Sequence, residues 1–100
     1  MSEVEWTMLK ETPNEFRFLV RCRDGGRVYR YRVTLDRAEK NRNFPGMRPE
    51  AVIQAAFRYL LRREPPSAIL PEFHIRQIED FFPGALAEIA EEGRQLPSEQ

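Results

Sequence analysis

The chain has 100 residues, of which 41% are hydrophobic and 32% are charged, and its formal net charge is zero. This length and composition are typical of a single globular domain that needs no disulfide or metal to hold its core together. No apolar run approaches the ~20 residues that span a membrane. The N-terminal sequence MSEVEWTMLK is acidic and lacks the apolar segment of a secretion signal, so we expect a cytoplasmic protein that does not enter a membrane.

A β-hairpin is the clearest predicted element. Gly25 and Gly26 can form its two-residue loop, because a type I′ turn requires positive φ at both central residues. Upstream, Val4, Trp6 and Met8 alternate with polar residues, which predicts a third strand and a three-stranded antiparallel meander. With the two glycines as the loop, the pairs on one face are all apolar: Cys22 with Tyr29, Val20 with Tyr31, Phe18 with Val33, and Phe16 with Leu35.

The second half of the chain carries helical patterns. One helical turn is expected over residues 36–42 and a longer helix over residues 49–63, where apolar side chains recur at helical spacing after an initial proline. Prolines then divide the chain into a short turn over residues 67–70 and a helical segment over residues 74–82. The final helix is expected over residues 84–93, where a glycine ends it.

These elements predict one α+β domain over residues 1–93, followed by a frayed tail over residues 94–100. In this domain an N-terminal antiparallel β-hairpin or three-stranded meander packs against three to four C-terminal helices. The helices are needed because an isolated hairpin is not stable in water and its apolar face must be covered.

Residues 55–83, AAFRYLLRREPPSAILPEFHIRQIEDFFP, carry a distinctive pattern. The stretch resembles a group of small bacterial proteins with the general pattern aF-x-FLL-x-REP-x-x-SIL-x-x-F-x-x-x-x-I-x-x-(Y/F)FP after a short β-rich segment. The matching positions are Phe57, Leu60, Leu61, Arg63, Glu64, Pro65, Ser67, Ile69, Leu70, Phe73, Ile78, Phe82 and Pro83. The resemblance implies one β-then-α domain. Because the group has no known function, it assigns no activity and no site.

Few residues of the chain suit catalysis. Cys22 is the only cysteine and lies among strand-forming residues, so we expect an inert, half-buried thiol. His74 is the only histidine, and the acids near it match no metal-binding spacing. The Gly-Gly pair lacks the strand-to-helix setting of a phosphate-binding loop. We therefore predict a protein that is not an enzyme and has no catalytic residue, metal or cofactor.

Arginine is concentrated in the predicted hairpin. Residues 17–32 hold six arginines and one aspartate, a net charge of +5, whereas residues 72–100 hold seven acids and two arginines, a net charge of −5. Arg21 stands opposite Arg30 in the predicted register, and like charges at that distance are destabilising unless an anion is near. The predicted anion- or partner-binding site is the face opposite the apolar pairs, with Arg17, Arg21, Arg23, Arg30 and Arg32.

Three sources of negative charge remain open for these arginines. The first is the chain itself, through Glu5 of the upstream strand or the glutamates of the last helix. The second is an acidic protein partner or a second copy of this chain, and the third is nucleic acid, whose phosphates bind arginine. A homodimer is also suggested because residues 57–82 hold more large apolar side chains than one small core readily covers.

The leading hypothesis is a small cytoplasmic interaction protein, monomeric or homodimeric, that contacts an acidic partner through the arginine-rich sheet face. The alternative is a nucleic-acid-binding protein that uses the same arginines.

Overall fold

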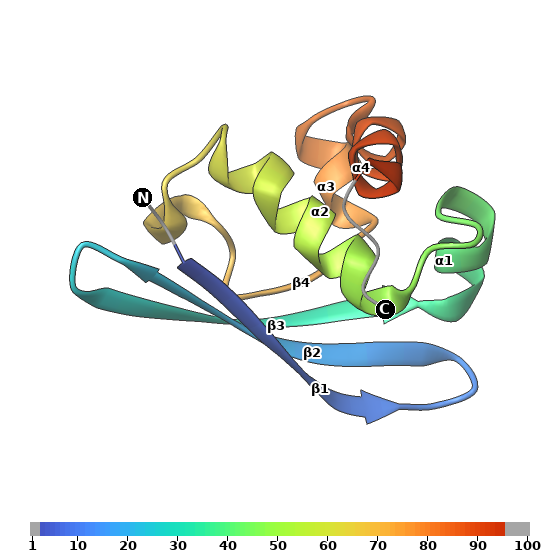
Figure 1. Ribbon diagram of the computed structural model, residues 1–100, viewed down its shortest axis with the longest axis horizontal. Coiled ribbons are helices and arrows are strands. Elements are labelled where there is room, and N and C mark those ends of the chain that lie inside the picture. The colour runs from blue at the N-terminus through green and yellow to red at the C-terminus, as the bar shows by residue number, and fades with distance from the viewer. Residues whose placement is uncertain (1–2, 96–100) are drawn as a thin grey trace.

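The computed structural model describes residues 3–95 and shows a four-stranded sheet with helices packed on one face (Figure 1). The strands are β1 (Glu3–Glu11), β2 (Glu15–Asp24), β3 (Arg27–Asp36) and β4 (Glu72–His74). The helices are α1 (Arg37–Asn43), α2 (Pro49–Leu61), α3 (Gln77–Phe81) and α4 (Ala85–Arg94), with a 3-10 turn, η1 (Pro66–Ala68), after α2. This arrangement confirms an α+β fold with N-terminal strands and C-terminal helices.

The β2–β3 hairpin has the predicted turn and register. Gly25 and Gly26 have φ angles of 59° and 85°, which side-chain-bearing residues rarely adopt. All four predicted apolar pairs form, so the apolar side chains of both strands lie on the same face of the sheet. Cys22 is completely buried rather than half-buried, because the core extends along this face to the last apolar pair before the turn.

β1 is the predicted third strand and forms one edge of the sheet, antiparallel to β2. Its register shifts between Met8 and Lys10, which makes a β-bulge. A bulge at an exposed edge disfavours pairing with another chain. Val4, Trp6 and Met8 are only partly buried against the core, so β1 is held less by packing than the other long strands.

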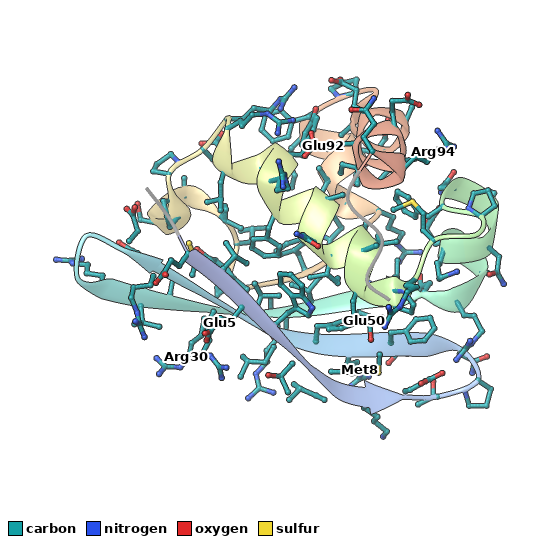
Figure 2. All side chains as sticks on the ribbon, in the orientation of Figure 1. Glu5, Met8, Arg30, Glu50, Glu92 and Arg94 are labelled. Carbon is teal, nitrogen blue, oxygen red and sulfur yellow. The ribbon has the colours of Figure 1, made fainter. Side chains whose placement is uncertain are left out.

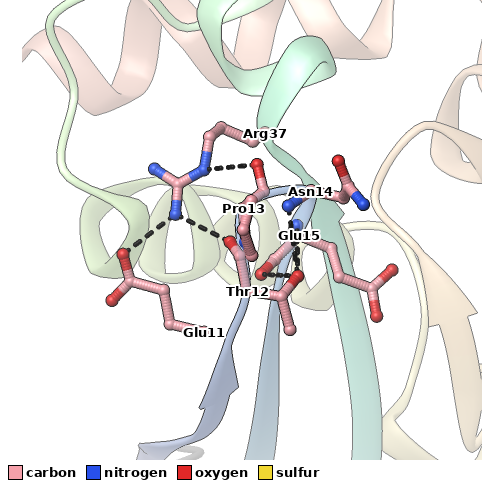
Figure 3. A network of polar contacts seen from close by, with 6 residues as sticks. All are labelled: Glu11, Thr12, Pro13, Asn14, Glu15 and Arg37. Carbon is pink, nitrogen blue, oxygen red and sulfur yellow. Dashed lines mark hydrogen bonds and ion pairs between the residues drawn. The ribbon is translucent and has the colours of Figure 1, made fainter.

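Arg37 of α1 holds the turn between β1 and β2 (Figure 3). Its Nε donates to the carbonyl of Pro13 at 3.1 Å, and its Nη2 donates to the carbonyl of Thr12 at 2.9 Å. The same Nη2 lies 2.9 Å from Glu11 Oε2. The guanidinium also lies over the Phe16 ring, 4.3 Å from its centroid. One side chain therefore ties the end of β1 to the start of β2.

The short strand β4 is absent from the sequence prediction, which treated residues 74–82 as helical from their start. Residues 72–74 instead pair in parallel with β3, with Phe73 opposite Val33, and helix α3 begins only at Gln77. Three residues are too few to show an alternating pattern. The partner strand also lies far away in the sequence, so no local signal marks the pairing.

Helix α2 covers the middle of the sheet and ends at Leu61, two residues before the predicted end. The ring of Phe57 lies 5.3 Å from that of Tyr31 and 6.0 Å from that of Phe73, so one aromatic cluster joins α2, β3 and β4. None of the helices in residues 3–95 is long and apolar enough to cross a membrane.

Helix α4 continues one residue beyond Gly93, where the prediction ended it. A side chain at Gly93 would collide with the terminal methyl of Met47, so the glycine permits a close approach and does not stop the helix. Arg94 consequently belongs to α4 and not to the predicted tail. Most of that tail, residues 96–100, lies outside the described residues.

Candidate functional site

The five predicted site residues lie on one surface of the sheet. Successive side chains of a strand point to opposite faces. Along β2 and β3 the arginines alternate with the apolar residues of the core, so they lie on the face away from the core. We call this surface the arginine face; it comprises Arg17, Arg21, Arg23, Arg30 and Arg32. Figure 2 shows Arg30 and Glu5 on the side of the sheet that carries no helix.

Acidic side chains of neighbouring positions neutralise part of the arginine face. Arg21 Nη2 lies 3.5 Å from Glu5 Oε1, and Arg23 Nη1 lies 4.0 Å from Glu3 Oε1. Both glutamates come from β1 and are more than 70% exposed, so these pairs contribute little stability. The prediction that Glu5 faces the arginines is therefore confirmed.

The β3 side of the arginine face is less neutralised. Within residues 3–95, Arg30 and Arg32 have no ion pair within 4.0 Å, although both are exposed. Arg30 stands opposite Arg21 in the register, and Glu5 pairs with Arg21 alone of these two. Glu72 of β4 is aligned with Arg32, but within residues 3–95 the two side chains form no ion pair. Positive charge is thus least compensated along β3.

The glutamates of the last helix do not reach the arginine face, which corrects one of the expected sources of negative charge. Glu92 pairs with Arg62 at 2.5 Å and with Arg58 at 3.7 Å, so it joins α4 to α2. Its hydrogen bond raises the pKa of the Arg62 guanidinium above its ordinary value. Glu88 pairs with Arg63. These acids face arginines of the helical layer because the helices pack on the opposite side of the sheet (Figure 2).

The arginine face carries no aromatic side chain of the hairpin. Tyr31 is buried on the core side, and Tyr29 is half-buried on the same side. The apolar members of the open face are aliphatic: Leu19 is half-buried, and Val28 is 41% exposed. The surface can therefore offer charge and some apolar contact, but no ring on which a nucleic-acid base would stack.

His74 lies in β4 beside Asp36, with 3.9 Å between its Nδ1 and Asp36 Oδ1. Arg76 Nη1 also lies 3.7 Å from Asp36 Oδ2. Glu79, a nearby acid in the sequence, instead accepts hydrogen bonds from the backbone N–H groups of Gly84 and Leu86. Among residues 3–95, no group of three or more His, Cys, Asp or Glu side chains is placed to hold a metal ion.

A second surface is part of the apolar excess that the sequence indicated in residues 57–82. The core buries most of the large apolar residues of the second half, but Leu70 remains 45% exposed and Phe81 63% exposed. They line an apolar pocket beside η1 and α3. A signal was present in the sequence, since the segments 65–71 and 81–87 contain no charged residue. Uncharged runs are equally typical of a core, so the sequence did not indicate which of these residues stay exposed.

Comparison with protein-family models, curated proteins and solved structures gave no match. The resemblance of residues 55–83 to small bacterial proteins stays a prediction.

Proposed function

We propose that this chain is a small cytoplasmic interaction protein, not an enzyme, that binds an acidic protein segment on its arginine face. The observation that carries this proposal is the pair Arg30 and Arg32, which are exposed on the open side of the sheet without an ion pair in the described chain. An external carboxylate would relieve the repulsion between Arg30 and Arg21, which stand opposite each other.

The rest of the surface favours a peptide partner. A guanidinium group binds a carboxylate with two parallel hydrogen bonds, which suits aspartate and glutamate side chains. Leu19 and Val28 lie among the arginines and can contact apolar side chains of a partner. The expected ligand is therefore an acidic segment that also carries aliphatic residues.

Nucleic acid is the alternative partner, and the number of arginines is the observation in its favour. Glu3, Glu5 and Glu72 lie along both sides of the arginine face and would repel a continuous phosphate backbone. The hairpin tyrosines that could stack on bases face the core. These features make a mixed acidic and apolar peptide the better fit.

Fluorescence anisotropy at low salt can test the proposal with four labelled probes. These are a short peptide of glutamate and leucine, its glutamine-for-glutamate counterpart, and single-stranded DNA and RNA oligonucleotides. The double variant Arg30→Glu/Arg32→Glu should weaken acidic-peptide binding at least about tenfold, because it reverses charge where compensation is least. The matched control Arg42→Glu/Arg48→Glu makes the same charge change at exposed arginines of α1 and the following loop.

Binding of the acidic peptide by the wild type and the control, but not by the β3 variant, supports the proposal. Equal loss in both variants would show a net-charge effect and overturn it, as would the absence of peptide binding. Preferential binding of oligonucleotides would establish the alternative, with a log–log salt slope of about −3.6 for four phosphate contacts.

A further inference from the structure

The outer edge of β3 is only partly covered by β4. Within residues 3–95, β4 pairs with residues 32–34 of β3, and no other strand lies on that side. Residues 27–31 therefore form an uncovered edge, which we call the β3 edge, and the hairpin end of the sheet projects beyond β4 (Figure 1). At about 3.3 Å per residue this edge is about 16 Å long, which is enough for one short added strand.

The backbone groups of the β3 edge point outward without partners. The N–H of Arg32 donates outward, to the carbonyl of Pro71 at 2.8 Å. Backbone groups of alternate residues in a strand point to the same side, so those of Val28 and Arg30 also point outward. Among residues 3–95 neither residue forms a backbone hydrogen bond on that side. Unpaired N–H and C=O groups at an exposed edge are a template for pairing with another strand.

A proline ends the pairing of β4 at this point. The N–H of Ile75 donates to the carbonyl of Thr34 at 3.0 Å. The bonds of a parallel ladder recur every two residues, so residue 71 stands where an N–H would donate to the carbonyl of Arg30. Residue 71 is a proline, which has no N–H. The chain's own strand therefore cannot continue, and the carbonyl of Arg30 stays available to a strand from another chain.

The charges of the β3 edge select which strands can pair with it. Arg30 and Arg32 lie on its open face and have no ion pair within residues 3–95. Pairing of two β3 edges would set the arginines of two copies side by side, and like charges across strands are destabilising. A strand with carboxylates on that face would instead neutralise both arginines. The edge therefore disfavours self-pairing through β3 and favours an acidic strand.

The other side of the β3 edge favours an apolar residue. Tyr29 points to the helical side of the sheet, where it is half-buried and packs against the core. A β-branched residue beside an aromatic ring is a stabilising cross-strand pair. Because side chains alternate between the faces of a strand, an occupant that suits both faces alternates acidic and β-branched residues.

We propose that the acidic partner binds as an added β-strand along residues 28–30, with its carboxylates over Arg30 and Arg32 and its apolar residues beside Tyr29. In this mode of recognition the backbone hydrogen bonds give affinity, and alternate side chains give specificity. The proposal rests on the proposed function and deepens it, because it names the conformation and the residue pattern of the partner.

Fluorescence anisotropy with designed peptides tests the strand. The first peptide is Glu-Val-Glu-Val-Glu between glycines, and the second has the same composition in the order Glu-Glu-Glu-Val-Val. The alternating peptide should bind at least about tenfold more tightly, because only its carboxylates all lie on one face of a strand. Equal affinities would overturn the proposal.

Backbone methylation of the alternating peptide tests the hydrogen bonds. One peptide is methylated on the amide nitrogen of the central glutamate, and another on that of a neighbouring valine. Only every second amide of an added strand faces the sheet edge, so one methylation should weaken binding about tenfold or more and the other should have little effect. Equal effects of the two methylations would contradict an added strand.

A substitution at Val28 tests the same hydrogen bonds from the side of the protein. Val28→Pro removes an outward N–H that takes no part in the ladder with β2, and an edge strand tolerates such a proline. It should weaken binding of the alternating peptide about tenfold or more, because one backbone donor is lost and the proline ring occupies the edge. The matched control Val28→Thr keeps the N–H and should bind as the wild type does. Equal losses in both variants would overturn the proposal.

The outcomes separate this proposal from the proposed function. If both peptide orders bind equally and Arg30→Glu/Arg32→Glu abolishes their binding, the acidic partner stands and the added strand is wrong. If no acidic peptide binds, both are wrong. Sedimentation velocity covers a second copy: open-ended oligomers of the wild type that Val28→Pro dissolves would place β1 of another copy on the β3 edge and overturn the acidic partner.

Discussion

The hydroxyl of Tyr31 donates a hydrogen bond of 2.5 Å to the carbonyl oxygen of Pro66. Tyr31 is buried in the middle of β3, and Pro66 begins the η1 turn that leads from α2 towards β4. The bond therefore connects the sheet to the segment that carries the apolar pocket. Burial, and to a lesser degree the neighbouring Cys22 and Tyr29, raise the pKa of Tyr31 to about 12.

Replacing Tyr31 with phenylalanine should lower the free energy of unfolding by about 1 kcal/mol, the usual net contribution of one hydrogen bond. The loss stays modest because the N–H of Ile69 also donates to the Pro66 carbonyl, at 3.3 Å. Urea unfolding at neutral pH measures the difference. An unchanged unfolding midpoint would show that this hydrogen bond contributes no net stability.

The same variant should change the alkaline stability of the protein. An unfolded tyrosine loses its proton near pH 10, whereas the native state keeps that of Tyr31 up to about pH 12. The contribution of Tyr31 is therefore fully present below pH 10 and is lost as the pH rises through 12. The stability difference between wild type and Tyr31→Phe should narrow over this interval. A constant difference would contradict the raised pKa.

Glu92→Gln should detach α4 from α2 more readily, because Glu92 pairs with both Arg58 and Arg62 and is only 19% exposed. We expect a loss of about 0.5 to 1 kcal/mol in unfolding free energy at low salt, and a smaller loss at high salt. Glu91→Gln is the matched control, since Glu91 pairs with Arg94 within the same helix. Equal losses in the two variants would rule out a specific link between the helices.

Glu79→Gln should weaken the start of α4. The backbone N–H groups of Gly84 and then Leu86 donate to the Glu79 carboxylate and lower its pKa. A lowered native pKa contributes stability that is present above the unfolded glutamate pKa and is lost as the pH falls through the native value. The difference between wild type and Glu79→Gln should therefore be larger at neutral pH than at about pH 3.

Urea unfolding at both pH values measures this difference, and Asp80→Asn serves as the control in the same helix. Within residues 3–95, the acceptor for the Gly84 and Leu86 N–H groups is Glu79, and Asp80 forms no hydrogen bond with α4. A difference that does not shrink in acid would show that the carboxylate charge has no part in capping α4.

Arg37→Lys should loosen β1 while it leaves the β2–β3 hairpin intact. A lysine ammonium cannot reproduce the planar contacts of Arg37 with the carbonyls of Thr12 and Pro13. Hydrogen exchange of the β1 amides that pair with β2 should become faster, with little change in the β2–β3 ladder. Arg42→Lys, in the same helix but 69% exposed, is the control. Uniform acceleration along all strands would instead indicate a global loss of stability.

The hairpin could be predicted in detail because its signals are local and independent. The glycine pair requires the turn, and the alternation of side chains requires one register, so two physical constraints agree on the pairing of Phe18 with Val33. Helix α2 could also be predicted from the sequence, because its apolar residues recur at helical spacing. The strand β4 was not, because three residues carry no period and their pairing with β3 joins distant parts of the chain.

The sequence by itself determined the two faces of the hairpin and the identity of the five arginines on one of them, since strand alternation assigns side chains to faces. Only the tertiary structure decided which acids neutralise them. The helices must pack on the apolar face to bury it, and this places the C-terminal glutamates on the far side from Arg30. The same packing left Phe81 exposed beside a pocket. The exposure of a side chain depends on how elements that are distant in the sequence cover one another, so it cannot be predicted from a local pattern of residues.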